Sequence, residues 1–354
     1  MRDMPITAHN HYSLLKHNTF GMDVKAKQFI SYQSVDELIE VLVALRDCGE
    51  RILHIGGGSN LLFTRDFEGT ILHSDIKFIE EVSRDGQHIL FRVGSGVVWD
   101  DFCSQMARDN YYGTENLSYI PGEVGASAIQ NIGAYGVEVE SIIHEVETIE
   151  VATGQFRVFQ AKECEYGYRD SIFKNTLRWQ YIVIAVVFRL SLISKVRLDY
   201  GPLQDFKSRE GVPTAQAIRD AVIDIRRSKL PEPSVLGSAG SFFKNPVVPV
   251  ETYQEIAATY TDVPHYVVDD RHIKIPAAWL IEQCGWKGKQ HGGAAVYEKQ
   301  PLILVNIGNA TPTDIIELAA LIEQSVKEKF KRQLHPEVNY VEYNKIETTW
   351  HHLS

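Results

Sequence analysis

The feature that most constrains the fold of this chain is a short run of glycines and small polar residues, GGGSN, at positions 56–60. Short apolar runs flank it on both sides, and each is typical of a β-strand, so the loop joins two strands. A dinucleotide-binding fingerprint needs a GxGxxG sequence that opens a helix, and a Walker A loop needs Gly-Lys-Ser/Thr at its end. The loop has neither feature, which excludes both of these nucleotide-binding motifs.

The glycine loop has two interpretations. It is either a tight turn or an anion nest, in which residues without side chains expose successive backbone N–H groups and Ser59 and Asn60 add donors. In the nest, Gly57 is expected to need a positive φ. A second glycine-rich stretch, 121–136, repeats this chemistry and has few charges near its middle. Two such loops in one chain favour the nest, and a cofactor that carries a diphosphate is a natural common ligand.

The size and composition of the chain are those of an ordinary globular protein. It has 354 residues, of which 44% are hydrophobic and 23% are charged, so two or three domains are expected. No apolar run approaches the roughly 20 residues that cross a bilayer, and the first residues lack the apolar core of a signal peptide. The four cysteines are scattered without a CxxC pair, which argues against a zinc site or a disulfide framework and favours a reducing cytoplasm.

The charge of the chain limits its partners. A net charge of −10 argues against a non-specific nucleic-acid binder, which needs a basic face. The chain can still bind anions, but only through local devices such as backbone N–H groups, helix N-termini or a compact basic cluster.

The hydrophobic pattern mixes helices and strands without a regular βαβ alternation, and it therefore predicts an α+β fold. Helices are expected at 34–46, 99–110, 214–229 and 311–330. Sheet is expected over 71–99, in a hairpin over 144–160 that turns at Thr153-Gly154, and in a buried strand over 179–191. Domain boundaries are expected near 77 and near 229–237, where two prolines interrupt the chain.

Two of these helices carry N-terminal signals. Ser34 and Glu37 have the spacing of a capping box. Thr311 is expected to be an N-cap, with Pro312 at the first helical position and Asp314 at the third.

Five segments together resemble a known family. They are GGGSNLL (56–62), NLSYIPGEVGASAIQNIGAYG (116–136), YGYRDSIFK (166–174), GSAGSFFKNP (237–246) and HPEV (335–338). Their order is that of the UDP-N-acetylenolpyruvoylglucosamine reductase (MurB) family, in the subgroup with a mobile-tyrosine insertion. The resemblance covers nearly the whole chain, from NTFG at 18–21 to HPEVNYV at 335–341. Ala128 stands where members of the family often carry proline.

The resemblance implies a fold and a cofactor. The fold is a two-part FAD-binding module of the vanillyl-alcohol oxidase type followed by a C-terminal α+β substrate-binding domain. The implied parts are 1–77, 78–230 with the tyrosine-loop insertion near 191–212, and 231–354. The implied FAD-binding residues all lie in the two glycine-rich stretches: Gly56, Gly57, Gly58, Ser59, Asn60, Gly122, Gly125, Ser127, Asn131, Gly133 and Gly136.

The resemblance also implies a reaction, the NADPH-linked reduction of an enolpyruvyl ether to a lactyl ether on a UDP-sugar. Arg169 and Glu337 are implied to stabilise the charge that develops on the substrate carboxylate, and Ser241 to supply the proton. Taken alone, Ser241 also fits a serine in a turn whose neighbours Phe242 and Phe243 fill the core. The functional interpretation expects these rings to keep water from the hydroxyl.

The substrate diphosphate needs positive charge that an acidic chain must provide locally. The resemblance implies Lys229, Lys244 and Asn245 as substrate ligands, and Tyr200 as the mobile tyrosine that closes over the diphosphate. Taken alone, Lys229 also fits a basic residue that complements the dipole at a helix C-terminus.

Two other functions remain open from the residues. One is an FAD-dependent alcohol oxidase of the same superfamily, which has no need of Lys229 and Glu337. The other is a non-enzymatic nucleotide-binding module, which leaves Arg169, Ser241 and Glu337 unexplained. The resemblance favours a cytoplasmic monomeric enzyme without a metal, and without nucleic-acid or membrane partners.

Overall fold

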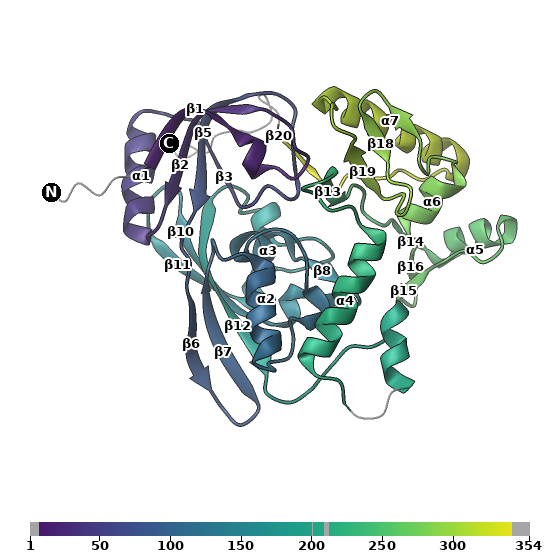
Figure 1. The fold of residues 1–354 in the computed structure, drawn as a ribbon, viewed down its shortest axis with the longest axis horizontal. Helices are drawn as coiled ribbons and strands as arrows, with labels where there is room; N and C mark the ends of the chain where they lie inside the picture. The colour runs from purple at the N-terminus through teal and green to yellow at the C-terminus, as the bar shows by residue number, and fades with distance from the viewer. Residues whose placement is uncertain (1–6, 200, 209–211, 342–354) are drawn as a thin grey trace.

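The computed structural model describes residues 7–199, 201–208 and 212–341, and it shows helices and strands in three groups (Figure 1). The α+β prediction is confirmed, because helices cover sheets that are largely antiparallel and no regular βαβ series is present in this part of the chain.

The N-terminal group is a four-stranded sheet with helix α1 (Val35–Asp47) beside it. The strand order is β1 (Thr7–Ser13), β2 (Lys25–Tyr32), β5 (Phe67–Ser74) and β3 (Ile52–Ile55). The helix predicted at 34–46 is confirmed, but its capping box is not. Ser34 accepts a hydrogen bond from the Glu37 N–H, while the Glu37 carboxylate accepts from the Gln33 N–H, one residue before the N-cap.

The second group is a five-stranded antiparallel sheet that lies between two helices. Its order is β11 (Phe156–Gln160), β10 (Ile143–Glu150), β12 (Tyr181–Ser191), β7 (His88–Gly94) and β6 (Ile79–Arg84). Apolar residues of α2 (Trp99–Arg108) pack on one face and those of α1 on the other. The predicted hairpin, the buried strand and the helices at 99–110 and 214–229 are confirmed, the last as α4 (Ala215–Lys229).

The C-terminal group has two small sheets and three helices. The sheets have the orders β13 (Gly237–Ser241), β19 (Ile303–Asn306), β18 (Ala294–Val296), β17 (Gln290–His291), and β14 (Val247–Pro249), β16 (His272–Lys274), β15 (Tyr266–Asp269). The helices are α5 (Val250–Thr259), α6 (Ala277–Gln283) and α7 (Pro312–Phe330). The predicted signals of α7 are confirmed, with a reciprocal capping box between Thr311 and Asp314.

The end of the described chain returns to the glycine loop. Strand β20 (Asn339–Val341) pairs in parallel with β4 (Leu61–Phe63), the strand that follows GGGSN. The loop therefore does join two strands, but β3 and β4 belong to different sheets. Apolar side chains of the N-terminal and C-terminal groups meet in one continuous core, which includes Phe63, Phe242 and Ile322.

The second glycine-rich stretch is not the loop that the sequence predicted over 121–136. Its first half is helix α3 (Val124–Gln130), and its second half is a hairpin of β8 (Gly133–Ala134) and β9 (Val137–Glu138). The sequence pattern did not predict this helix because the helix contains Gly125. That glycine allows close packing, since a Cβ at this position would lie 2.8 Å from Ser95 Cβ. The remaining short elements are 3₁₀ helices at Leu14–His17, Glu115–Leu117, Val139–Ser141, Ala161–Cys164, Ile172–Lys174 and Gly201–Ser208.

A half-buried histidine in the N-terminal sheet makes stability depend on pH. His54 Nε2 lies 2.7 Å from the Tyr32 hydroxyl, and burial lowers the pKa of His54 to about 3. The unfolded chain binds a proton at this histidine below about pH 6.5, but the folded chain does not until about pH 3. Because the unfolded state then holds more protons, the free energy of unfolding falls as the pH falls through this window.

We expect His54→Gln to make the free energy of unfolding less sensitive to acid. Between about pH 4 and pH 6, its slope against pH falls by up to about 1.4 kcal/mol per pH unit. Urea-unfolding curves at a series of pH values measure this slope in both proteins. An identical slope in the two would show that His54 is not neutral in the folded chain.

Candidate active site

Ser241 ends strand β13, and a β-bulge places it there. The register against β19 shifts between Ser238 and Ser241, and Gly240 has a positive φ of 71° with open space on the side where a Cβ would project. Glycine adopts this conformation without steric cost, and the bulge turns Ser241 outward, where it is exposed. Phe242 and Phe243 are buried. The expectation that these rings shield the hydroxyl from water is wrong for this structure, because they lie in the core.

The segment after Ser241 runs beside the HPEV segment. The Glu337 N–H donates to the Phe242 carbonyl at 2.8 Å, and the Lys244 N–H donates to the His335 carbonyl at 2.9 Å. Phe243 and Pro336 form an antiparallel bridge. Two segments that lie far apart in the sequence are thus fixed to each other by their backbones, and Glu337 lies next to the end of β13.

Arg169 reaches this pair from the second group of elements. Its Nε lies 3.1 Å from Glu337 Oε1, and its Nη1 lies 3.6 Å from Glu138 Oε1. The guanidinium also donates to the carbonyl oxygens of Asn131 and Gly133. Gly133 is required here, since a Cβ at this position would lie 2.9 Å from the Val137 carbonyl oxygen. The structure therefore brings two of the three predicted catalytic side chains, Arg169 and Glu337, into contact, and it connects the third through the backbone.

Lys174 is a member of this cluster that the sequence reasoning missed. Its Nζ donates to the Arg169 carbonyl at 2.8 Å, and this bond supports Arg169 in the left-handed conformation, with φ of 55°. Burial lowers the pKa of Lys174 to about 8, and the charge of Lys244 contributes to the shift while Glu337 opposes it. The available signal was the position of Lys174 at the end of the YGYRDSIFK motif.

The carboxylates of the cluster are held among cations. Burial raises the pKa of Glu337, while the charges of Arg169, Lys174 and Lys244 oppose that rise. Burial likewise raises the pKa of Glu138 against the charge of Arg169. Desolvation and positive neighbours act on the same groups, which is the arrangement that active sites use to tune acids and electrophiles.

The two glycine-rich stretches meet. The Ser59 hydroxyl donates to the Pro121 carbonyl at 3.0 Å, and a Cβ on Gly57 would have Gly122 Cα, 3.7 Å away, as its nearest neighbour. Gly58 is required by the fold itself, since it has φ of 64° and its Cβ would lie 1.9 Å from the His17 carbonyl oxygen. Gly57 has room for a side chain, so its lack of one leaves space beside the loop.

Asn60 connects the glycine loop to the predicted catalytic carboxylate. Its side-chain Nδ2 donates to the Glu337 carbonyl at 3.2 Å, and its own carbonyl accepts from the Asn339 N–H at 3.0 Å. Anything that binds at residues 56–60 therefore lies next to the segment that carries Glu337.

The residues around this loop fit FAD. Two buried polar atoms of the predicted FAD segment, Ser118 Oγ and Gln130 Nε2, have no hydrogen-bond partner among the described residues, and buried polar groups in native proteins are normally satisfied. These two donors, which the sequence reasoning did not single out, and the open face at Gly57 are the features that a diphosphate and a polar isoalloxazine ring require.

Other predicted FAD-binding residues have structural reasons to be present. The Asn131 carboxamide donates to Glu138 and to the Gly167 carbonyl and accepts from the Glu140 N–H. Ser127 donates to the Val124 carbonyl, and Gly136, with φ of 80°, forms the turn of the β8–β9 hairpin. Their contact with the cofactor stays a prediction.

The predicted substrate residues do not all lie in one place in the structure. Asn245 accepts from the Ala277 N–H at 2.8 Å and donates to the Tyr168 hydroxyl at 3.3 Å, which ties it to the residue before Arg169. Lys244 lies in the same cluster. Lys229 is exposed at the end of α4, and its side chain has no bonded partner in the described part of the chain. Tyr200 lies outside the described residues.

Two further features bear on other functions. Within the described ranges, no group of three or more histidine, cysteine, aspartate or glutamate side chains lies together in a way that could hold a metal ion. Among the helices of residues 7–199, 201–208 and 212–341, none is both long and apolar enough to span a bilayer.

Comparison with known proteins identifies both halves of the chain. Residues 26–160 match a family model described as an FAD binding domain, and residues 232–341 match the model of the UDP-N-acetylenolpyruvoylglucosamine reductase C-terminal domain. The curated reductase of that name from Bacteroides fragilis (strain YCH46) is 51% identical over 331 residues, which are 93% of this chain and 99% of the relative. That of Porphyromonas gingivalis (strain W83) is 48% identical over 334 residues, or 93% and 98%.

A solved structure shares the fold. The crystal structure of UDP-N-acetylenolpyruvylglucosamine reductase from Thermus caldophilus aligns with a TM-score of 0.65. The alignment covers 96% of this chain and 100% of the other at 22% identity. The predicted FAD-binding module with a separate C-terminal domain is confirmed by these matches.

Proposed function

The chain belongs to the UDP-N-acetylenolpyruvoylglucosamine reductase family, and we propose that Arg169, Ser241 and Glu337 are its catalytic residues. The protein is an FAD-dependent oxidoreductase of peptidoglycan precursor synthesis. It reduces the enolpyruvyl ether of UDP-N-acetylglucosamine to UDP-N-acetylmuramate, with NADPH as the hydride donor.

FAD, when bound, supplies the hydride that adds to the vinyl carbon of the substrate. The protein must then deal with the negative charge on the adjacent carbon and its carboxylate. Arg169 provides a fixed cation, oriented by its ion pair with Glu337 at 3.1 Å and by the Lys174 bond to its carbonyl. Preorganised charge of this kind stabilises the transition state without a cost of reorganisation during the reaction.

Ser241 delivers the proton that completes the reduction. Its exposed hydroxyl has no hydrogen-bond partner among the described residues, so it is free to donate to a carbon of the substrate. Loss of this proton leaves an alkoxide, which nearby cations favour, and the cations Arg169, Lys174 and Lys244 act on Glu337 in the segment bonded to the end of β13. The proton transferred is the one on Ser241 Oγ, and the bond formed is the C–H bond at the carbon next to the carboxylate.

The observation that carries this assignment is the junction of Arg169, Glu337 and the β13 end. One ion pair and one backbone hydrogen bond join three segments that lie far apart in the sequence. The test is anaerobic titration of the purified protein with NADPH, which should bleach its flavin absorbance, followed by addition of the enolpyruvyl substrate, which should restore it. A yellow protein that an alcohol bleaches but NADPH does not would favour the oxidase alternative. A colourless protein that does not take up FAD would favour the binding module.

The substrate diphosphate is proposed to lie between α4 and the Lys244–Asn245 wall, with Lys229 as one of its cations. Lys229 is exposed and has no partner of its own among the described residues, so its charge is available to a ligand. Tyr200 is proposed to close over the diphosphate.

Replacement of Lys229 by alanine should raise the KM for the UDP-sugar and leave NADPH reduction of the flavin unchanged. A charge-assisted hydrogen bond contributes on the order of 1.5–3 kcal/mol, so about a 10- to 150-fold rise is expected. Added salt should weaken substrate binding more in the wild type than in the variant, because the variant has lost the screened charge.

Steady-state kinetics at two ionic strengths measure this effect. Lys162→Ala, which removes an exposed lysine next to edge strand β11, is the matched control and should leave KM unchanged. A Lys229→Ala protein with a normal KM and a lowered melting temperature would show that Lys229 only stabilises the end of the helix.

The domain division at 1–77, 78–230 and 231–354 is proposed with the insertion near 191–212. The hydrophobic core follows these boundaries only in part. Buried residues of 1–77 and of 231–354 pack together in one shared core. A monomer is proposed, since Arg169, Ser241 and Glu337 all come from one chain. A cytoplasmic location is proposed because the described cysteines are all free thiols and a UDP-sugar is an intracellular precursor.

A further inference from the structure

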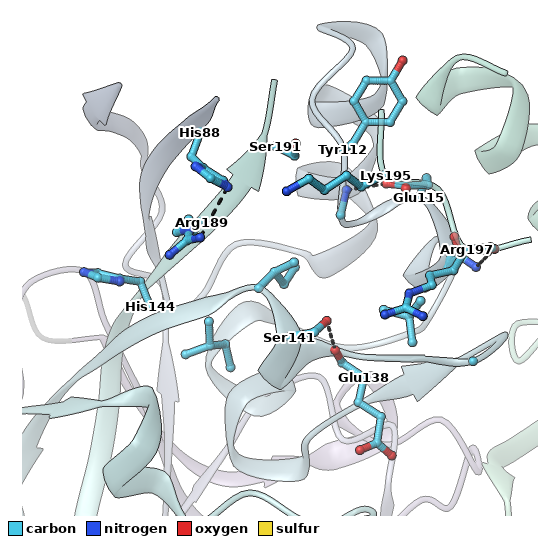
Figure 2. A pocket seen from close by; sticks show the side chains of 16 residues that line it. His88, Tyr112, Glu115, Glu138, Ser141, His144, Arg189, Ser191, Lys195 and Arg197 are labelled. Atoms are coloured by element: carbon cyan, nitrogen blue, oxygen red, sulfur yellow. Dashed lines mark hydrogen bonds between the residues drawn. The ribbon is translucent and has the colours of Figure 1, made fainter. Parts of the chain in front are cut away.

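A cavity of about 440 Å³ lies beside the β8–β9 hairpin and is not lined by Ser241 or Glu337. Its walls come from β7, β10, β12, the 3₁₀ helix Val139–Ser141 and the chain that follows β12 (Figure 2). Volumes of this size hold small organic ligands in proteins. Of the predicted catalytic and FAD-binding residues, Gly136 alone lines it.

Basic residues from four parts of the chain line this cavity. They are His88 of β7, His144 of β10, Arg189 of β12, and Lys195 and Arg197 of the segment after β12. Three of these residues, Arg189, Lys195 and Arg197, are cations that line one hollow of a protein with a net charge of −10. Such a local excess of positive charge concentrates anions there.

Two acidic residues, Glu115 and Glu138, also line the cavity. The Glu115 carboxylate accepts from the Gly113 N–H at 2.5 Å, and burial raises its pKa. Glu138 lines the cavity with its backbone, but its carboxylate points away from the basic groups in Figure 2 and contacts Arg169 and Asn131 instead.

Two of the three cations, Lys195 and Arg197, are left available. Lys195 and Arg197 have side chains with no hydrogen bond or ion pair among the described residues, and only the Arg197 carbonyl is used, by Asn116. Arg189 donates to His88 Nε2 at 3.3 Å. This contact orients Arg189, and its charge also acts on the Asp85 carboxylate, which lies 3.7 Å from His88 Nδ1.

Part of the remaining wall is apolar and is formed by Val137, Ile142 and Ile143. Guanidinium groups bind phosphate oxygens bidentately and lysine binds them as a point charge, while an apolar wall suits the ring of a sugar or base. We propose that this cavity binds an organic phosphate of about mononucleotide size, with the phosphate between Arg189, Lys195 and Arg197.

None of the side chains proposed to contact the UDP-sugar, Arg169, Lys229, Ser241, Lys244, Asn245 and Glu337, lines this cavity, and the test uses this difference. The FAD-loaded, oxidised protein is saturated with the enolpyruvyl substrate in the absence of NADPH, so that no turnover occurs and the catalytic site is filled. AMP is then titrated in by calorimetry, with inorganic pyrophosphate in a parallel titration. The wild type should bind one equivalent of AMP, and the affinity should fall as salt is added.

The double variant Lys195→Ala/Arg197→Ala should lose at least about 10-fold in affinity for AMP, since it removes two charge-assisted contacts. Both side chains are exposed, so the change should leave the melting temperature within the range of the wild type. Lys162→Ala/Arg178→Ala removes the same charge from exposed positions elsewhere and should bind AMP normally. If pyrophosphate binds as tightly as AMP, the phosphate contacts alone account for the affinity. If pyrophosphate binds more weakly than AMP, contacts with the apolar wall account for part of the affinity.

Two outcomes would overturn the proposal. One is a wild type that binds neither AMP nor pyrophosphate once the catalytic site is filled. The other is a Lys195/Arg197 variant that binds both as tightly as the charge-matched control.

Discussion

The Ser241→Ala protein is expected to bind FAD and be reduced by NADPH at the wild-type rate, yet to reduce its substrate about 10²- to 10⁴-fold more slowly. A positioned general acid contributes this much to a rate, and the Ser241 hydroxyl acts only when a proton reaches the substrate carbon. Stopped-flow absorbance measures the two half-reactions separately: bleaching by NADPH, then recovery on addition of the enolpyruvyl substrate.

The structure makes this variant a clean test. Ser241 is exposed, and its hydroxyl makes no hydrogen bond within the described part of the chain, so its removal breaks no contact of the folded protein. Ser325→Ala, which removes a hydroxyl bonded to the Leu321 carbonyl on α7, is the matched control and should leave both half-reactions unchanged. Slower bleaching by NADPH with a normal recovery phase would contradict the role assigned to Ser241.

The Gly57→Val protein is expected to fold and to lose its FAD. The nearest atom to a Cβ at Gly57 is Gly122 Cα at 3.7 Å, which is an ordinary contact, and Gly57 does not have a positive φ. The backbone can therefore accept a side chain, but a β-branched one fills the space through which a ligand approaches the loop N–H groups. Flavin absorbance after gel filtration, and the affinity of the apoprotein for added FAD, measure the loss.

Gly58→Ala gives the contrasting result. A Cβ there would lie 1.9 Å from the His17 carbonyl oxygen, at a φ of 64°, so this change should lower the melting temperature of the apoprotein itself. Gly57→Val should leave that temperature near the wild-type value. A Gly57→Val protein that retains its full complement of FAD would mean that residues 56–60 are only a turn.

The expectation that the middle glycine of this loop needs a positive φ is corrected by the same geometry. A sequence shows that three glycines are adjacent, but it does not show which one turns left-handed. Contact with His17 decides this, and His17 belongs to an earlier part of the chain that no local pattern connects to the loop.

The sequence by itself determined the positions of four helices and the order of the motifs. Periodic apolar residues and capping side chains placed the helices that became α1, α2, α4 and α7, because the 3.6-residue period and the N-cap depend on neighbours within one or two turns. The order of the five motifs also identified the family. Glycine-rich composition, in contrast, did not distinguish a loop from helix α3, because Gly125 is there for packing against Ser95.

The tertiary structure decided which of these local features meet. The pairing of β20 with β4 brings the Asn60 side chain within 3.2 Å of the Glu337 carbonyl, 277 residues away in the sequence. Arg169 has a left-handed backbone conformation, its guanidinium contacts Glu337, and its carbonyl accepts a hydrogen bond from Lys174. The tertiary structure also turned Ser241 outward and its two phenylalanines inward through one bulge. Sequence patterns report dihedral preference and burial over a few residues, whereas these contacts depend on strand pairing and core packing between segments that are distant along the chain.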